Sequence, residues 1–295
     1  MLTRKRLAHR IREFQNLPFI IGTNPHIHAV YELYWDAFEK LRSVPALHSL
    51  QDNEAFCALI KRMLSDHLVV IPQLAWGMAQ SYSLMPESDS DRFMTETLKS
   101  RIGRRVLAEQ HLALSESWEA HHGDHDLGRW IGLIDTACQS EKIVQKCSQK
   151  AAAHIQEAYG ARPPEVLING HLDAEFLYIP DHIEYILFEL IKNSMQATLK
   201  KHAESGKFPP ILVTLGQHQA SVVFRVSDQG GGIDGAIQKS VFSFAQGARR
   251  NLDNFIQIPK MAAKMNEPNR LFSLGLSMAM SKVYSKYFFF NLASE

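Results

Sequence analysis

The sequence is poor in cysteine, in long apolar runs and in net charge. Its three cysteines, Cys57, Cys138 and Cys147, include no C-x-x-C pair, so we expect no disulfide framework and a reducing compartment. No apolar run reaches the roughly 18 residues that a membrane span needs, so we expect no span. The 32 basic and 31 acidic residues nearly cancel, so no overall field favours nucleic acid as a partner.

Apolar residues recur at helical spacing through the first half of the chain. With 295 residues, 45% of them hydrophobic, the chain is long enough for two domains with separate cores. From about residue 25 to 156 the apolar stripes alternate with breakers such as Pro45 and Pro86. Such a run predicts an all-helical bundle. We expect roughly four helices, over residues 30–41, 56–67, 92–114 and 141–158.

The pattern changes between Gly160 and Pro164, where strand-like segments begin. Residues 166–168 and 176–179 read as strands, and residues 211–215 and 222–226 alternate as a hairpin whose turn we place at 216–219. The sequence therefore predicts an α+β protein. Residues 1–158 are expected to form the four-helix bundle, and residues 159–295 a mixed sheet with helices against it.

The segment between the strands predicts a nucleotide site. Glu189 and Asn193 are four residues apart on a helix whose apolar positions form one stripe, so they share a face, and Lys192 lies beside them. The second hairpin strand leads directly into Asp228 and three glycines, where the backbone can approach a ligand closely. An acid, an amide and a glycine turn on one sheet are typical of nucleotide binding.

These residues resemble a known family. Glu189-x-x-Lys192-Asn193 followed by Asp228-x-Gly230-x-Gly232 resembles the N box and first glycine box of the GHKL ATP-binding (Bergerat) fold. Residues 13–25 and 100–111 resemble the helical domain of the mitochondrial α-ketoacid dehydrogenase kinases, and the resemblance runs from about residue 13 to 288. The stretch 20–25 and Tyr185 favour the branched-chain enzyme over the pyruvate enzyme.

The resemblance implies roles for the site residues. Asn193 is expected to hold Mg²⁺ against the phosphates of ATP, and Glu189 to orient or deprotonate the attacking serine hydroxyl. Lys192 is expected either to neutralise phosphate charge or to be a solvated lysine. For Glu189 the alternative to the family role is an ordinary acid on an exposed helix face. Asp228 is expected to accept from the adenine amino group. The expected ATP-binding set is Glu189, Lys192, Asn193, Gln196, Asp228, Gly230, Gly232, Gly275 and Leu276, with Gly230 and Gly232 leaving room for the base and permitting positive φ.

The resemblance also implies partners and a location. It predicts a serine kinase that inactivates the E1 component of a mitochondrial α-ketoacid dehydrogenase complex, and a helical domain that docks the lipoylated E2. The expected location is the mitochondrial matrix, and a homodimer is left open. The basic residues 1–12 are read either as the start of a first helix or as the tail of a presequence.

A second cluster in the helical half is a regulatory candidate. Arg101, Arg104, Arg105 and His111 fall in the segment that resembles the family. The arginines are read either as a site for an acidic regulator, such as the branched-chain keto acid, or as a solvated basic face. His111 is interpreted as a packed histidine. The histidines at 121, 122 and 125 lie in a Gly/Asp-rich stretch, which favours a solvated loop over a metal site.

The chain departs from the family near its end. Residues 269–276, where the second glycine box is expected, contain Gly275 as their only glycine, and the lid segment 242–247 lacks paired threonines. In the family a Gly-Gly turn and two more strands follow the helix at 277–287. We therefore expect a truncated isoform or a mis-joined reading frame, and keep as the alternative a non-catalytic scaffold that binds the dehydrogenase complex but nucleotide only poorly.

Overall fold

The computed structural model describes residues 2–81, 83–120, 128–218, 221–238, 240–250 and 276–287. The chain divides into two compact units, one of Met1–Gly123 with Lys239–Glu295 and one of Asp124–Gln238. Helices and two small sheets make it an α+β protein, as the sequence predicted. Among the described residues, no helix combines the length and the apolar character that crossing a bilayer requires.

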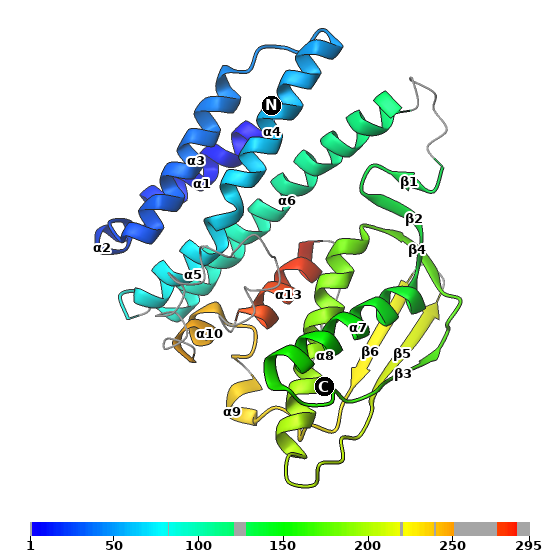
Figure 1. Ribbon diagram of the computed structural model, residues 1–295. Helices are drawn as coiled ribbons and strands as arrows, with labels where there is room; N and C mark the ends of the chain where they lie inside the picture. The colour runs from blue at the N-terminus through cyan, green and yellow to red at the C-terminus, as the bar shows by residue number, and fades with distance from the viewer. Residues whose placement is uncertain are drawn as a thin grey trace. The chain divides into compact units, whose positions relative to one another are not determined.

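The described part of the first unit is helical. α1 packs against α3 and α6, α3 packs also against α5, and α4 packs against α6, while α10 and α13 contact α6 (Figure 1). The elements are α1 (Leu2–Gln15), α2 (Phe19–Gly22), α3 (Pro25–Ser43), α4 (Leu50–Asp66), the 3₁₀ turn η1 (His67–Val69), α5 (Val70–Gln80), α6 (Glu87–Ala120), α10 (Phe244–Arg250) and α13 (Ser277–Tyr287).

Capping residues in the sequence mark the positions where two of these helices start. Asn24 caps α3 with its side-chain oxygen, which accepts from the amides of His26 and Ile27. Ser49 and Asp52 form a reciprocal capping box at the start of α4. The stripe predicted on α3 is the buried one, since Val30, Tyr34, Ala37 and Leu41 all lie in the core. Helical spacing was therefore a sound guide to which face is covered.

The second unit carries both sheets. An antiparallel sheet has the strand order β1-β2-β4, and a mixed sheet has the order β3-β5-β6 with β3 parallel to β5. Helices α7 and α8 pack against each other and contact strands of both sheets (Figure 1). The elements are β1 (Trp130–Ile131), β2 (Ile134–Gln139), α7 (Ser140–Tyr159), β3 (Val166–Gly170), β4 (Glu175–Tyr178), α8 (Pro180–Lys201), β5 (Ile211–His218), β6 (Ser221–Ser227) and α9 (Gly235–Gln238).

Two expectations about the helical half need correction. The helix predicted at 141–158 forms as α7, but it packs against α8 in the second unit instead of completing a bundle. The stretch before it is not helical, because β2 pairs with β4, which follows α7 in the chain. A long-range pairing of this kind leaves little local signal. A four-helix bundle ending at residue 158 is therefore not what the structure contains.

The predicted hairpin forms, with a later turn than expected. β5 continues through Gly216, which pairs with Val223, as far as His218, which pairs with Ser221. The turn at 216–219 was placed too early because Gly216 was read as a breaker. β6 ends at Ser227, so the strand does lead directly into Asp228.

Candidate nucleotide site

Helix α8 carries the predicted N-box residues. Pro180 occupies its first turn, where the missing amide hydrogen costs no helical bond. Ile183, Ile186, Leu187 and Ile191 are buried along the predicted stripe. Burial of this stripe fixes the rotation of α8, and so decides which way the polar residues between these positions face.

Glu189 and Lys192 form a buried ion pair. The Lys192 Nζ donates to both carboxylate oxygens of Glu189, at 2.9 and 2.8 Å. The Glu189 side chain is 0% exposed and the Lys192 side chain 3%. Burial lowers the pKa of Lys192, and the neighbouring Glu189 carboxylate opposes that shift. The alternatives of an exposed helix acid and a solvated lysine are therefore wrong.

Asn193 and Gln196 are half-buried on the same helix. Asn193 follows Lys192 directly, and its amide oxygen is the type of ligand that Mg²⁺ accepts from proteins. One protein oxygen is enough for a magnesium ion that keeps several waters and bridges to phosphate. Among the residues that the structure describes, no group of three or more His, Cys, Asp or Glu side chains could hold a metal by itself.

The glycine turn packs directly onto α8. Asp228 is exposed at the end of β6, and its Oδ1 accepts from the Gly230 amide at 2.8 Å. A Cβ added to Gly230 would lie 2.5 Å from the Cβ of Ala197, so only glycine fits there. Gly231 and Gly232 have positive φ, at 93° and 75°. Positive φ at Gly232 was predicted, whereas Gly230 is required for close approach and not for its backbone angle.

The remaining predicted ATP contacts lie elsewhere in the chain. Gly275, like the rest of residues 251–275, is outside the described residues, as are the histidines at 121, 122 and 125 and residues 288–295. Leu276 is buried just before α13, in the first unit. Part of the predicted lid forms α10 in that unit, where the Ala245 amide donates to Asp91 of α6 at 2.9 Å. A role for Leu276 and Gly275 at the nucleotide stays a prediction.

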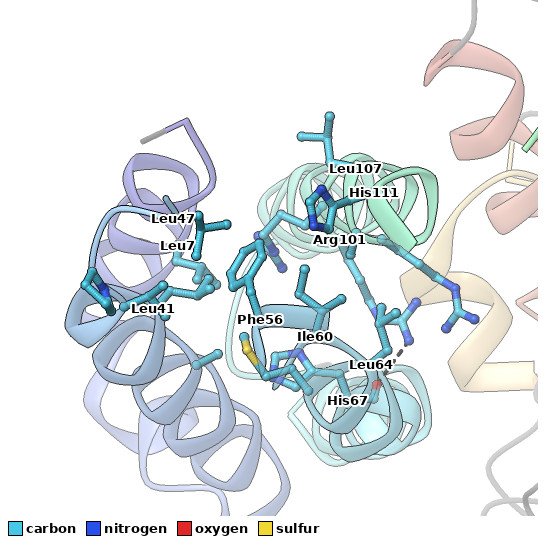
Figure 2. Close-up of a pocket in the computed structure, with 17 residues that line it drawn as sticks. Leu7, Leu41, Leu47, Phe56, Ile60, Leu64, His67, Arg101, Leu107 and His111 are labelled. Atoms are coloured by element: carbon cyan, nitrogen blue, oxygen red, sulfur yellow. Dashed lines mark hydrogen bonds between the residues drawn. The ribbon is translucent and has the colours of Figure 1, made fainter. Parts of the chain in front are cut away.

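The regulatory candidates surround a cavity in the first unit. The cavity has a volume of about 390 Å³ and lies between α1, α3, α4 and α6. Figure 2 shows Phe56 and Ile60 of α4 facing Arg101 and His111 of α6 across it. The lining is largely apolar and includes Leu7, Leu41, Leu47, Met63, Leu64, Leu107 and Ala108, with His67, Arg104 and Arg105 among its polar members.

Two of its arginines are buried with unused donors. Arg101 and Arg104 are each 8% exposed, so a solvated basic face is wrong for them. Arg101 donates to the His67 carbonyl oxygen at 3.0 Å (Figure 2), and the Arg104 guanidinium lies over the Tyr34 ring. Within the described parts of the chain, Arg101 Nε and Arg104 Nη2 have no hydrogen-bond partner. Buried donors of this kind are costly unless a ligand or water satisfies them.

The other two candidates differ from this pair. Arg105 is partly exposed and pairs with Glu109 one turn along α6 at 2.6 Å. His111 packs edge-on against the Phe56 ring, and its buried Nε2 has no partner within the described ranges. The carboxylate-binding potential of the cavity therefore rests mainly on Arg101 and Arg104.

The chain was compared with known proteins. Residues 2–135 match the family model described as mitochondrial branched-chain alpha-ketoacid dehydrogenase kinase. A yeast (Saccharomyces cerevisiae) protein named mitochondrial [pyruvate dehydrogenase (acetyl-transferring)] kinase 2 is 30% identical over 264 residues, which are 86% of this chain and 53% of that protein. These matches make the chain similar to the mitochondrial α-ketoacid dehydrogenase kinase family.

Other relatives of this family match over more of their length. The mitochondrial pyruvate dehydrogenase kinase of Arabidopsis thaliana is 27% identical over 96% of this chain and 75% of its own length. Mouse isozyme 4 is 25% identical over 96% of this chain and 68% of its own length. The chain spans about half the length of the yeast relative and more of these two.

Sequence reasoning missed some residues at both sites. His67 was predicted as the last residue of the helix over 56–67, yet it lines the cavity. Burial together with Arg104 and Arg101 lowers its pKa to about 4. The bidentate contact of Lys192 with Glu189 was not predicted, although their i, i+3 spacing made it reachable. The spacing of the two residues could be read from the sequence, whereas the burial of their side chains could not.

Proposed function

We propose that the chain is an ATP-dependent protein-serine kinase of a mitochondrial α-ketoacid dehydrogenase complex. The observation that carries the proposal is the arrangement on α8, where the buried Glu189 lies one turn before Asn193 and the glycine turn packs on Ala197. Similarity to the kinase family supports the same reading. The expected location is the mitochondrial matrix, since the relatives are named mitochondrial.

The proposed chemistry assigns one task to each residue. Mg²⁺ bound with ATP would neutralise phosphate charge, and Asn193 is its proposed protein ligand. Glu189 orients the serine hydroxyl and accepts its proton as the phosphoryl group is transferred. Asp228 accepts from the adenine amino group with its exposed carboxylate. Gly230 and Gly232 form the turn beside the base, and Gln196 lies one turn beyond Asn193 along α8.

The substrate we propose is a serine of the E1 component, with the branched-chain complex favoured over the pyruvate complex. The family model that matches residues 2–135 carries the branched-chain name, while the yeast and Arabidopsis relatives carry the pyruvate name. The helical first unit is proposed to dock lipoylated E2 and the second unit, which carries α8, to bind ATP. A homodimer is a further proposed state. Phosphorylation of both E1 proteins, compared at equal concentration, decides the preference.

A second proposed role belongs to the cavity of about 390 Å³. Its buried arginines, Arg101 and Arg104, suit a carboxylate, and its apolar walls suit an aliphatic chain. We propose that it binds an acidic regulator such as a branched-chain α-keto acid. Arg105 and His111 lie at the same cavity and complete the candidate set.

Titration with Mg-ATP tests the kinase site. Asn193→Ala and Asp228→Ala are compared with the wild type, and Asn169→Ala and Asp173→Ala serve as exposed controls in the same unit. We expect saturable binding by the wild type and the controls, and at least tenfold weaker binding by the two site variants, since each removes a charged or metal contact (about 1.5–3 kcal/mol). If the wild type binds Mg-ATP no more tightly than the site variants do, the kinase proposal is wrong and the non-catalytic scaffold is supported.

A further inference from the structure

The buried pair on α8 bears on how the proposed phosphoryl transfer is controlled. Lys192 Nζ is bonded to both oxygens of Glu189, at 2.9 and 2.8 Å, so a single ammonium spans the whole carboxylate. Such a contact opposes rotation of the carboxylate about its last side-chain bond. The two residues belong to one helix, three positions apart, so their backbones hold a constant separation.

The surroundings hold Lys192 at this position. Its side chain is 3% exposed, and the cation also lies 5.4 Å from the centre of the Phe188 ring. On the facing helix α7, burial and the nearby Lys192 charge lower the pKa of His154, so His154 favours its neutral form beside the pair. The other buried acid of α8, Glu184, is bonded instead to Lys146 and Lys150 of α7.

A lysine in this position is poorly placed to serve ATP. Two of its three donors are used on Glu189, and withdrawal toward a phosphate would leave a fully buried carboxylate without this cation. The contacts of Lys192 therefore favour its pairing with Glu189 over the predicted role of neutralising phosphate charge. A carboxylate that receives a proton must be held in the right orientation toward the hydroxyl. A small misplacement of the carboxylate lowers the rate of transfer strongly.

We infer that Lys192 is a positioning residue that orients the Glu189 carboxylate, and that it is not a ligand of the ATP phosphates. This inference rests on the proposed kinase function. It predicts that loss of Lys192 lowers the rate of transfer and leaves the affinity for nucleotide nearly unchanged. The effect passes through Glu189, so it disappears when Glu189 can no longer accept a proton.

The test uses Lys192→Met, Lys192→Arg, Glu189→Gln and the double variant Lys192→Met/Glu189→Gln. Mg-ATP affinity is measured by titration, and kcat and KM are measured for E1 phosphorylation. We expect Lys192→Met to lower kcat on the order of 10²-fold, as for a misplaced catalytic group, with the ATP Kd changed less than about threefold. Lys192→Arg, which keeps the charge and two donors, should recover part of the loss.

The double variant keeps the inference falsifiable if Lys192→Met folds poorly. It removes both charges of the buried pair, and we expect its kcat to equal that of Glu189→Gln alone, because the two residues act as one unit. A rise of about tenfold or more in the ATP Kd of Lys192→Met, or losses that multiply in the double variant, would make Lys192 a phosphate ligand and overturn the inference. Failure of the wild type to bind Mg-ATP or to phosphorylate E1 would overturn the proposed function itself.

Discussion

Gly230 is in direct contact with Ala197: a Cβ at position 230 would lie 2.5 Å from the Cβ of Ala197 and 2.9 Å from its carbonyl carbon. This contact joins the glycine turn after β6 to the helix that carries Glu189 and Asn193. The Gly230 amide also donates to Asp228, so the same residue holds the proposed adenine acceptor. The two parts of the candidate nucleotide site are thus aligned by a single position without a side chain.

The substitution Gly230→Ala is expected to separate the turn from α8. Backbone atoms of Ala197 cannot move aside cheaply, so overpacking should cost about 1–3 kcal/mol of unfolding free energy and weaken Mg-ATP binding. Gly235→Ala is the matched control, because a Cβ there meets nothing within 4 Å. Denaturant unfolding and ATP titration measure the two effects. Equal behaviour of the two variants would show that the close contact is unimportant.

Removal of a buried arginine should weaken carboxylate binding in the cavity. Arg101→Gln and Arg104→Gln are each expected to weaken binding of a branched-chain α-keto acid by about tenfold or more, the worth of a charge-assisted hydrogen bond. Arg92→Gln is the control, because Arg92 lies on the same helix with a side chain 75% exposed. Calorimetric titration gives the affinities. Binding that all three variants retain, or that the methyl ester of the acid shares, would contradict a carboxylate site.

Stability should fall on acidification through His67. Its folded-state pKa is lowered to about 4 from the ordinary 6.5, so between these values the unfolded chain binds more protons than the folded chain. The stability is fully present above pH 6.5 and is lost as the pH falls toward 4, by at most about 3 kcal/mol. Unfolding free energies of the wild type and His67→Gln, measured from pH 7 to 4, should converge as the pH falls. Substitution of the more exposed His28 should leave the wild-type slope unchanged.

Loss of Glu184 should loosen α7 from α8. Its carboxylate bonds Lys146 at 2.5 Å and Lys150 at 3.2 Å, and its side chain is 11% exposed, while both lysines are about half exposed. Solvent screens the lysine side of these pairs, so Glu184→Gln should cost only about 1 kcal/mol, and less in high salt. The exposed Glu165 offers a control as Glu165→Gln. A cost that does not change with salt would indicate packing instead of charge.

Much of the local structure was readable from the sequence. The Val30–Leu41 stripe, the hairpin before Asp228 and the apolar face of α8 were predicted because each depends on spacing within one element. The pairing of Glu189 with Asn193 on one helix face followed from the helical period alone. By contrast, β2 forms by pairing with β4, which lies beyond α7 in the chain. A local sequence pattern does not indicate so distant a pairing partner.

The sequence was sufficient to indicate the family, the α+β class and the residue types of the candidate site, since these follow from motif spacing and from the periods of helix and strand. The burial of Glu189 and Lys192, the place of α7 against α8 and the cavity around Arg101 required the folded structure. Each depends on which surfaces meet when distant segments pack, and the same glutamate or arginine in water would have been an ordinary exposed charge.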